Sequence, residues 1–346
     1  MLQTILPAYG LKEESLAVEA FGSGLINHTW KITTPEAAYI LQKVNHNVFE
    51  NPANIAHNIK QIAMYLKQHD PNYLFVAPLL SGNGEEMVYK KDEGFFRMFP
   101  FVPRSHSIDV VETPEQAFEA AVQFGRFTRL LGGLNVNRLK ITVPHFHDLS
   151  LRYQQFVAAL KQGNKERVQE SEALIKKVML HADIVAEYKD ICVNKKIKQR
   201  VTHHDTKISN VLFDENGTGI CVIDLDTVMP GFFISDIGDM MRTYLSPANE
   251  EERDFTKIAV RDLFYKAIVR GYLTEMNDEL IETEKRYVFY SGKFMIYMQA
   301  LRFLTDYIND DVYYGAKYSR HNLVRAGNQL TLLQRLLEKE PTLQRL

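Results

Sequence analysis

Residues 201–242 read VTHHDTKISNVLFDENGTGICVIDLDTVMPGFFISDIGDMMR, and they combine two short apolar runs with many histidine and carboxylate side chains. The apolar runs, 211–213 and 220–223, are separated by turn-forming residues that include Asn216-Gly217. Apolar runs joined by an Asn-Gly turn predict a β-hairpin. Because an antiparallel hairpin brings its two outer ends together, we expect the polar side chains before the first run to meet those after the second.

The polar residues at the open end of this hairpin are those that phosphoryl transfer requires. Asp205 and Asn210 are five residues apart, an arrangement in which the Asp accepts the proton of an attacking hydroxyl and the Asn helps to hold Mg²⁺ on nucleotide phosphates. Asp224, after the second run, is the natural second metal ligand, because Mg²⁺ prefers oxygen ligands and takes only one or two protein carboxylates. Lys207 is expected to place a positive charge on the transferred phosphate.

Two other interpretations of the stretch are open. Acidic loops beside hairpins are common, and His-Asp pairs often only cap turns. A metal hydrolase is a second alternative, with His204 and Asp205 as ligands and His145 and His147 supplying further imidazoles. This second alternative leaves Asn210, Lys207 and Asp224 without a role, so phosphoryl transfer is the preferred prediction.

The stretch resembles the catalytic core of the aminoglycoside phosphotransferase and choline kinase family. Three segments, DTKISNVLFD (205–214), CVIDLDTVMPG (221–231) and DIGDMMR (236–242), are most similar to the N-acetylhexosamine 1-kinases within it. The resemblance extends to YILQKVN (39–45) and LRFLTDYINDDVYY (301–314), and so covers most of the chain.

The resemblance implies an α+β, two-lobed, protein-kinase-like fold. The expected N-terminal nucleotide-binding lobe, residues 1–102, has a small antiparallel sheet, and the expected C-terminal catalytic and substrate-binding lobe, residues 103–346, is mainly helical. Apolar alternation and turn residues predict strands at 29–33, 39–44, 75–80, 86–91 and 94–101, with a helix after Pro52. Helices are predicted from Pro114 and near Ser150, twice within 161–198, from about Asp239, and over 253–272, 283–308 and 320–339.

The resemblance also implies an ATP site in the N-terminal lobe. Gly22, Ser23 and Gly24 are expected in a turn over the nucleotide, and Lys43 is expected to hold the α- and β-phosphates. Phe99 and Phe101 are expected at the hinge beside the adenine. The family pairs this lysine with a glutamate of the following helix, but the helix here has no acid in its first turns, and Glu50 is the nearest candidate.

For the acceptor, the resemblance favours Arg302 and Tyr313 near a sugar. His145 and Asp226 are further candidates, since His145 precedes a predicted helix and Asp226 lies two residues beyond Asp224. Asp226 is expected to contact a second metal ion or the sugar. His203 and Asp239 are expected to support the catalytic loop, and Asp236 either shares that role or binds substrate.

Composition sets limits on the class of protein. The chain has 346 residues, 45% hydrophobic and 24% charged, which is typical of a globular protein of two lobes. Its formal net charge of −2 gives no overall attraction to nucleic acid or anionic membrane. Two cysteines, Cys192 and Cys221, make no disulfide framework, and Cys221 is expected to be buried. No apolar run is typical of a signal peptide or a membrane span, so a cytoplasmic location is expected. The sequence carries no signal of the oligomeric state, and a monomer is the default expectation.

The resulting hypothesis is an ATP- and Mg²⁺-dependent kinase of a small molecule. The expected acceptor is the anomeric 1-hydroxyl of N-acetylglucosamine or N-acetylgalactosamine. An alternative keeps the chemistry and changes the acceptor to choline, methylthioribose or an aminoglycoside. A second alternative is a nucleotide-binding pseudokinase that regulates a partner, which only the missing helix glutamate favours.

Overall fold

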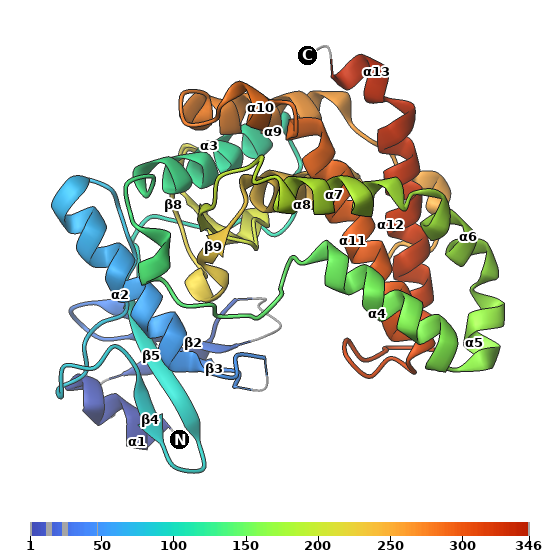
Figure 1. Cartoon of the computed structure of the whole chain (residues 1–346). Helices are drawn as coiled ribbons and strands as arrows, with labels where there is room; N and C mark the ends of the chain where they lie inside the picture. The colour runs from blue at the N-terminus through green and yellow to red at the C-terminus, as the bar shows by residue number, and fades with distance from the viewer. Residues whose placement is uncertain (1, 12–15, 23–26, 47, 345–346) are drawn as a thin grey trace.

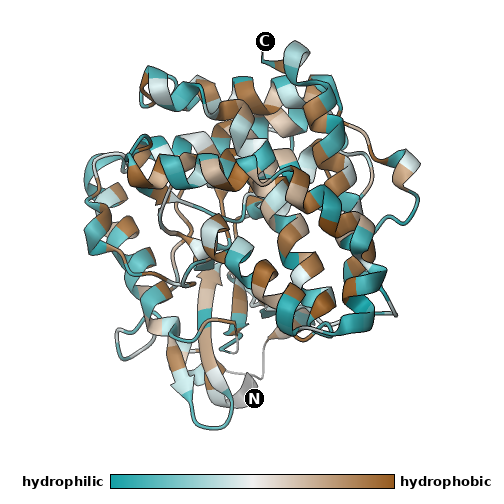
Figure 2. Cartoon of the chain, turned by 45° about the vertical axis from the view of Figure 1, so that its right-hand side comes forward, coloured by the Kyte–Doolittle hydropathy of each residue, from teal (hydrophilic) through white to brown (hydrophobic). Residues whose placement is uncertain are grey.

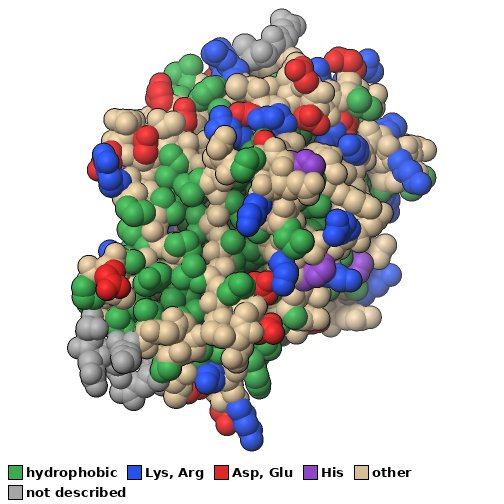
Figure 3. Space-filling view, turned by 90° about the vertical axis from the view of Figure 1, so that its left-hand side faces the viewer, with side chains coloured by type: hydrophobic (Ala, Val, Ile, Leu, Met, Phe, Trp, Pro, Cys, Tyr) green, Lys and Arg blue, Asp and Glu red, His purple; other side chains and the backbone are tan. Residues whose placement is uncertain are grey.

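The computed structural model describes residues 2–11, 16–22, 27–46 and 48–344. Figure 1 shows a small lobe built on a β-sheet and a larger lobe built of helices, with helix α2 (Pro52–His69) lying between them. The α+β, two-lobed, protein-kinase-like fold expected from the sequence is therefore confirmed. Acidic and basic side chains are interspersed on the face shown in Figure 3, and hydrophobic side chains gather across its middle.

The sheet of the small lobe is antiparallel throughout and has the strand order β1-β2-β3-β5-β4. Its strands are β1 (Ala17–Ala20), β2 (His28–Thr33), β3 (Ala38–Val44), β4 (Val88–Lys90) and β5 (Gly94–Pro100). The strands predicted at 29–33, 39–44, 86–91 and 94–101 are thus present. The strand predicted at 75–80 is wrong, because this segment makes a backbone bond from Leu79 to Met98 of β5 without forming a ladder.

The two faces of this sheet have different neighbours. Leu41 and Met98 are paired across β3 and β5 and pack with Ile5 and Leu6 of the short N-terminal helices α1 (Leu2–Ile5) and η1 (Leu6–Tyr9). Successive residues of a strand point to opposite faces. Val44 accordingly lies on the other face, where it joins the hydrophobic core that includes α2 and the large lobe.

The helices of the large lobe are arranged around one long buried helix, α11 (Val288–Ile308). In Figure 2, hydrophobic and hydrophilic residues alternate along these helices, as amphipathic packing requires. The others are α3 (Pro114–Leu130), α4 (Leu149–Gln162), α5 (Lys165–Glu170), α6 (Glu172–Leu180), α7 (Asp183–Val193), α8 (Phe233–Tyr244), α9 (Asp262–Met276), α10 (Glu282–Lys285), α12 (His321–Glu338) and α13 (Glu340–Leu343).

Several predicted helix bounds need correction. Residues 161–198 hold three helices beyond the end of α4 rather than two. The helix predicted from residue 253 begins only at Asp262, and the one predicted over 283–308 is divided into α10 and α11. Helix α8 begins at Phe233, six residues before Asp239. The division into α10 and α11 falls within a charged segment, Glu282–Lys285, whose helix-favouring residues hide the boundary.

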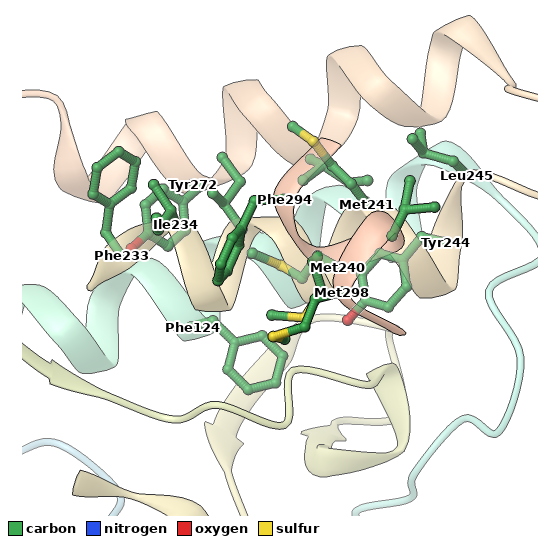
Figure 4. Close-up of a cluster of buried hydrophobic side chains, with 14 of the residues drawn as sticks. Phe124, Phe233, Ile234, Met240, Met241, Tyr244, Leu245, Tyr272, Phe294 and Met298 are labelled. Carbon is green, nitrogen blue, oxygen red and sulfur yellow. The ribbon is translucent and has the colours of Figure 1, made fainter. Parts of the chain in front are cut away.

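The predicted hairpin is present, and its second strand packs against helix α3, where Gln123 donates to the Gly219 carbonyl. Strands β7 (Val211–Phe213) and β8 (Gly219–Val222) pair antiparallel, and β6 (Arg200–Thr202) pairs with β9 (Met229–Gly231) beside them. Apolar side chains of α8 pack with residues of α3, α9 and α11, as Figure 4 shows. Cys221 is buried, as expected. Among the described helices, none has the length and apolar character of a bilayer span.

Candidate active site

The loop that precedes the hairpin is held by two carboxylates of helix α8. Asp236 accepts hydrogen bonds from the backbone N–H groups of His203 (2.9 Å) and His204 (2.8 Å). Asp239 accepts one from the N–H of Thr206 at 2.9 Å. Residue His204 has φ +66°, a left-handed conformation that is rare outside glycine and needs such support. The loop conformation around Asp205 is therefore set by α8.

Further contacts enclose the same loop. The Tyr244 hydroxyl donates to the Thr206 carbonyl at 2.6 Å, and the Thr227 hydroxyl donates to the His203 carbonyl at 2.7 Å. Figure 4 places Tyr244 at one end of the α8 core. Burial raises the pKa of Asp236 to about 7, although its two backbone hydrogen bonds act in the opposite direction. The His203 ring lies 2.9 Å from the Ile223 carbonyl through Nε2, so it joins the loop to the end of β8.

Asp205, Lys207 and Asn210 lie together, as the spacing predicted. The Lys207 Nζ is 3.2 Å from the Asp205 carboxylate. The Asn210 amide nitrogen donates to the Asp205 carbonyl at 2.8 Å and to its carboxylate at 3.1 Å. Burial opposes the charge on Lys207, but Asp205 and Asp224 outweigh it and raise the lysine pKa. One carboxylate, one cation and one amide group thus face the same space.

Asp224 follows the hairpin and lies close to this group. The Ile223 N–H donates to the Asn210 carbonyl at 2.9 Å, so the two predicted metal ligands come from adjacent, hydrogen-bonded chain segments. Asp224 has φ +59°, and its side chain keeps access to solvent although protein surrounds it on most sides. Desolvation by the surrounding protein, together with Asp226 and Asp205, raises its pKa to about 7. Carboxylate and amide oxygens, as Asp224 and Asn210 carry, are ligand types that suit a hard divalent cation.

Asp226 does not share a strand face with Asp224, because strand β8 ends at Val222, before both residues. Residues 225–227 form a 3₁₀ turn, η5, and Asp226 is buried within it. One carboxylate oxygen is 2.5 Å from Nη1 of Arg97, and the other accepts from Nδ2 of Asn27 at 2.8 Å. Both partners belong to the small lobe, so Asp226 joins the lobes rather than standing open to a sugar or a second metal ion.

Lys43 lies away from the other predicted site residues. It shares a strand face with Leu41, and its ammonium lies 5.9 Å from the ring centroid of Phe96. Gln42, one residue earlier, is on the face toward the large lobe, where its carbonyl oxygen accepts two hydrogen bonds from Arg97. Lys43 was expected to hold the nucleotide phosphates, but it lies on the opposite face of the strand from Gln42. Neighbouring residues of a strand point to opposite faces. No ion pair of Lys43 with Glu50 is present among the described residues.

The aromatic residues predicted for the nucleotide lie on the side of the sheet that carries Arg97. The guanidinium of Arg97 is 5.1 Å from the Phe99 ring centroid. Phe101 contacts Phe21 edge to face at 6.1 Å, and Lys31 lies 4.7 Å over the Phe101 ring. Gly22 is next to Phe21 and has φ +80°, as a tight turn requires. Ser23 and Gly24 lie outside the described residues.

Arg302 and Tyr313 line a pocket of 630 Å³ between α4, the end of α11 and the loop that follows it. The Arg302 guanidinium lies 5.6 Å from the Phe146 ring centroid, Phe146 stacks on His147, and His147 lies 5.3 Å from His204. This series of rings connects the pocket to the residue before Asp205. The lining residues are Arg152, Gln155, Ala158, Ala159, Gln162, Arg302, Thr305, Asp306, Asn309, Tyr313 and Tyr314.

His145 does not line that pocket, and its ring lies 3.3 Å from the Asp148 carboxylate near the start of α4. Asp148 caps α4 by accepting a hydrogen bond from the N–H of Leu151. The metal-hydrolase alternative finds no support. The His204 ring is enclosed by Thr202 and Thr227, and no group of three or more His, Cys, Asp or Glu side chains suited to a metal occurs in the described parts of the chain.

Three residues of the site escaped the sequence reasoning. Arg97 is a lone cation in the aromatic strand GFFRMFPF, and a buried charge of that kind requires a partner. The alternation of β3 places Gln42 and Lys43 on opposite faces but does not tell which face meets the large lobe. Arg152 had no local signal, because its place beside Arg302 depends on how α4 packs on α11.

Comparisons with known proteins identify the family of the chain and show proteins with a similar fold. Residues 17–279 match the family described as the phosphotransferase enzyme family. The structure is similar to amicoumacin kinase hAmiN in complex with AMP-PNP and Ca²⁺, with a TM-score of 0.64, 16% identity, and 96% and 92% of the two chains covered. It is also similar to an aminoglycoside phosphotransferase from Alicyclobacillus acidocaldarius (TM-score 0.67, 12% identity, coverage 100% and 97%). A choline/ethanolamine kinase family protein from Mesorhizobium loti has a TM-score of 0.58 and 15% identity, with 99% of this chain and 95% of that chain covered.

Proposed function

Since the chain belongs to the phosphotransferase enzyme family, we propose that it transfers a phosphoryl group from ATP to the anomeric hydroxyl of an N-acetylhexosamine. The observation that carries this proposal is the gathering of Asp205, Lys207, Asn210 and Asp224 at the open end of the hairpin, beside a pocket that carries two guanidinium groups. The carboxylates, lysine and amide supply the chemistry, and the pocket supplies the acceptor site.

In this proposal Asp205 accepts the proton of the attacking sugar hydroxyl. Its carboxylate is oriented by the amide of Asn210 and balanced by the ammonium of Lys207, which also faces the phosphoryl group in transfer. Asn210 and Asp224 would hold Mg²⁺, which when bound neutralises charge on the nucleotide phosphates. The backbone bonds from Asp236 and Asp239 keep the loop in one conformation and so hold Asp205 ready for reaction.

The pocket favours an acceptor rich in oxygen and without positive charge. Arg152 and Arg302 both line it, and no carboxylate is paired with either within the described chain. Burial and the neighbouring Arg302 lower the pKa of Arg152, which indicates that the two cations are close. A cationic acceptor such as choline would be repelled there by the two guanidinium groups.

The acidic residue of the pocket, Asp306, forms no ion pair with either arginine within the described residues. Its carboxylate accepts hydrogen bonds from the N–H groups of Tyr313 (2.7 Å) and Tyr314 (3.0 Å) and from the amide of Asn322 (3.1 Å). It therefore shapes the loop after α11. The hydroxyl and acetamido oxygens of a neutral sugar can accept from guanidinium donors, and the two tyrosines offer flat surfaces for its ring.

The test is ADP release with Mg-ATP across acceptors of different charge. The panel holds N-acetylglucosamine, N-acetylgalactosamine, plain hexoses, a hexuronic acid, choline, methylthioribose and kanamycin. We expect turnover with the two acetylated sugars and an acid-labile product without a reducing end. Arg302→Met should raise the KM for the sugar at least about tenfold, as loss of a charge-assisted hydrogen bond predicts. Arg335→Met, on the exposed side of α12, serves as the matched control.

Other outcomes separate the parts of the proposal. Turnover with choline or kanamycin instead would reject the acceptor assignment and keep the phosphotransfer chemistry. Turnover with the hexuronic acid alone would mean that the two arginines select a carboxylate. Mg²⁺-dependent ATP binding with no turnover on any acceptor would favour the regulatory alternative.

A further inference from the structure

The buried guanidinium of Arg97 connects the two lobes at the candidate metal site. Arg97 lies on β5 and is 1% exposed, so its charge depends on protein partners. Its Nε and Nη2 donate to the Gln42 carbonyl oxygen at 3.1 and 2.8 Å. Its Nη1 is 2.5 Å from Oδ1 of Asp226. Gln42 orients the guanidinium within the sheet, and the third nitrogen points across to the large lobe.

A second residue of the small lobe holds the same carboxylate. The Asn27 amide nitrogen donates to Oδ2 of Asp226 at 2.8 Å, while its oxygen accepts from the backbone N–H of Asn45 at 3.0 Å. Asn45 directly follows β3, and Asn27 directly precedes β2. Both oxygens of Asp226 are therefore fixed by side chains that are themselves held by the sheet.

Asp226 is linked to the candidate metal ligand Asp224 by a short and rigid segment. Asp224 has left-handed backbone angles (φ +59°, ψ +62°), Leu225 is buried, and residues 225–227 form the turn η5. On its other side, Ile223 donates to the Asn210 carbonyl. A segment fixed at Ile223 and at Asp226 leaves Asp224 little freedom, so the position of its carboxylate depends on the Asp226 contacts.

We propose that Arg97 is a positioning residue which, through Asp226, holds Asp224 in place for a divalent cation and ties that site to the nucleotide-binding sheet. Arg97 occupies the face of the sheet on which Gln42, rather than Lys43, is presented to the large lobe. The inference rests on the metal-binding part of the proposed function and is independent of the acceptor.

The experiment measures nucleotide binding rather than turnover. ADP binding to wild type and Arg97→Met is followed by calorimetry across a Mg²⁺ titration that begins in EDTA. We expect Arg97→Met to need at least about tenfold more Mg²⁺ for half-maximal enhancement of binding, since loss of groups that orient metal ligands costs about 10–100-fold in affinity. Binding in EDTA should stay within about twofold of wild type, because Arg97 acts through the metal site.

A matched variant separates positioning from general stability. Arg200 forms another buried arginine–carboxylate pair, with Glu284 at 2.6 Å inside the large lobe. Arg200→Met leaves a buried carboxylate without its partner, as Arg97→Met does, and should lower Tm. Its Mg²⁺ dependence should equal that of wild type. Asn27→Ala removes the second bond to Asp226 and should shift the Mg²⁺ dependence in the same direction by a smaller factor.

Each result has a distinct meaning. Equal Mg²⁺ dependence in wild type, Arg97→Met and Asn27→Ala would overturn the inference, even if Arg97→Met melts earlier. If Arg200→Met showed the same shift in Mg²⁺ dependence, the effect of Arg97→Met would be one of general stability and the inference would be wrong. If wild type itself shows no Mg²⁺-enhanced binding of ADP, the proposed phosphotransfer function fails first. Should Arg97→Met not fold, Arg97→Lys and Asn27→Ala provide the same comparison.

Discussion

At the scale of single residues, Asp205 is the group whose chemistry the proposed reaction needs most. Its carboxylate is within hydrogen-bonding reach of Asn210 and Lys207, and α8 fixes the loop that carries it. Asp205→Asn preserves the shape of the side chain but removes the proton acceptor. We expect kcat to fall roughly 10²–10⁴-fold, the usual contribution of a general base, with Tm little changed.

The measurement is steady-state ADP release with saturating sugar. Asp214→Asn, in the turn of the hairpin, is the control, because Asp214 accepts backbone hydrogen bonds from Asn216 and Thr218 and lies at the opposite end of the strands. Near-wild-type turnover by Asp205→Asn would show that another group accepts the proton.

At the scale of elements, strand β9 lies very close to the catalytic loop at Gly231. A Cβ added at Gly231 would lie 2.3 Å from both the His204 ring and the Thr202 hydroxyl. Gly231→Ala must therefore push β9 away from β6 or displace His204. We expect a loss of about 1–3 kcal/mol in the free energy of unfolding, as overpacking of a close contact typically causes, together with a lower kcat.

Urea unfolding followed by tryptophan fluorescence and circular dichroism measures this change. The control is Gly82→Ala, where an added Cβ would meet its nearest neighbour at an ordinary 3.6 Å. If Gly231→Ala were as stable and active as wild type, the loop would have more freedom than its contacts indicate.

At the scale of the whole molecule, several buried groups make stability depend on pH. Burial lowers the pKa of His204 to about 4, and burial also lowers those of His203 and His147. In the unfolded chain a histidine titrates near about 6.5. Between about pH 6.5 and 4 the unfolded state therefore binds more protons at His204, and its contribution to stability is lost as the pH falls.

The contribution of His204 is measured as the difference in unfolding free energy between wild type and His204→Gln. The total pH dependence is not used, because raised carboxyl pKa values such as that of Asp236 increase stability as the pH falls. The unfolding free energies of wild type and His204→Gln are compared at each pH from about 8 to 4, a range chosen to span both pKa values. We expect the advantage of wild type to shrink by up to about 3 kcal/mol toward pH 4. A gap that stays constant with pH would mean that His204 is not buried as a neutral ring.

The sequence alone indicated the family and the broad architecture of this protein. The spacing of Asp205, Lys207 and Asn210, and the hairpin that returns the chain to Asp224, depend on short-range geometry that a local pattern records. Apolar periodicity likewise located α3 and α12 to within a residue or two. Such features are predictable because turns, strands and helix faces are set by residues close together in the chain.

Tertiary structure alone decided which side chains meet across the lobes. The contact of Arg97 with Asp226 joins residues far apart in sequence, and the face that carries Gln42 rather than Lys43 is set by how β3 enters the sheet. The pocket around Arg152 and Arg302 likewise depends on the packing of α4 against α11. Neither the choice of strand face that meets the large lobe nor a long-range ion pair leaves a local pattern in the sequence. Both are decided by contacts that exist only once the chain has folded.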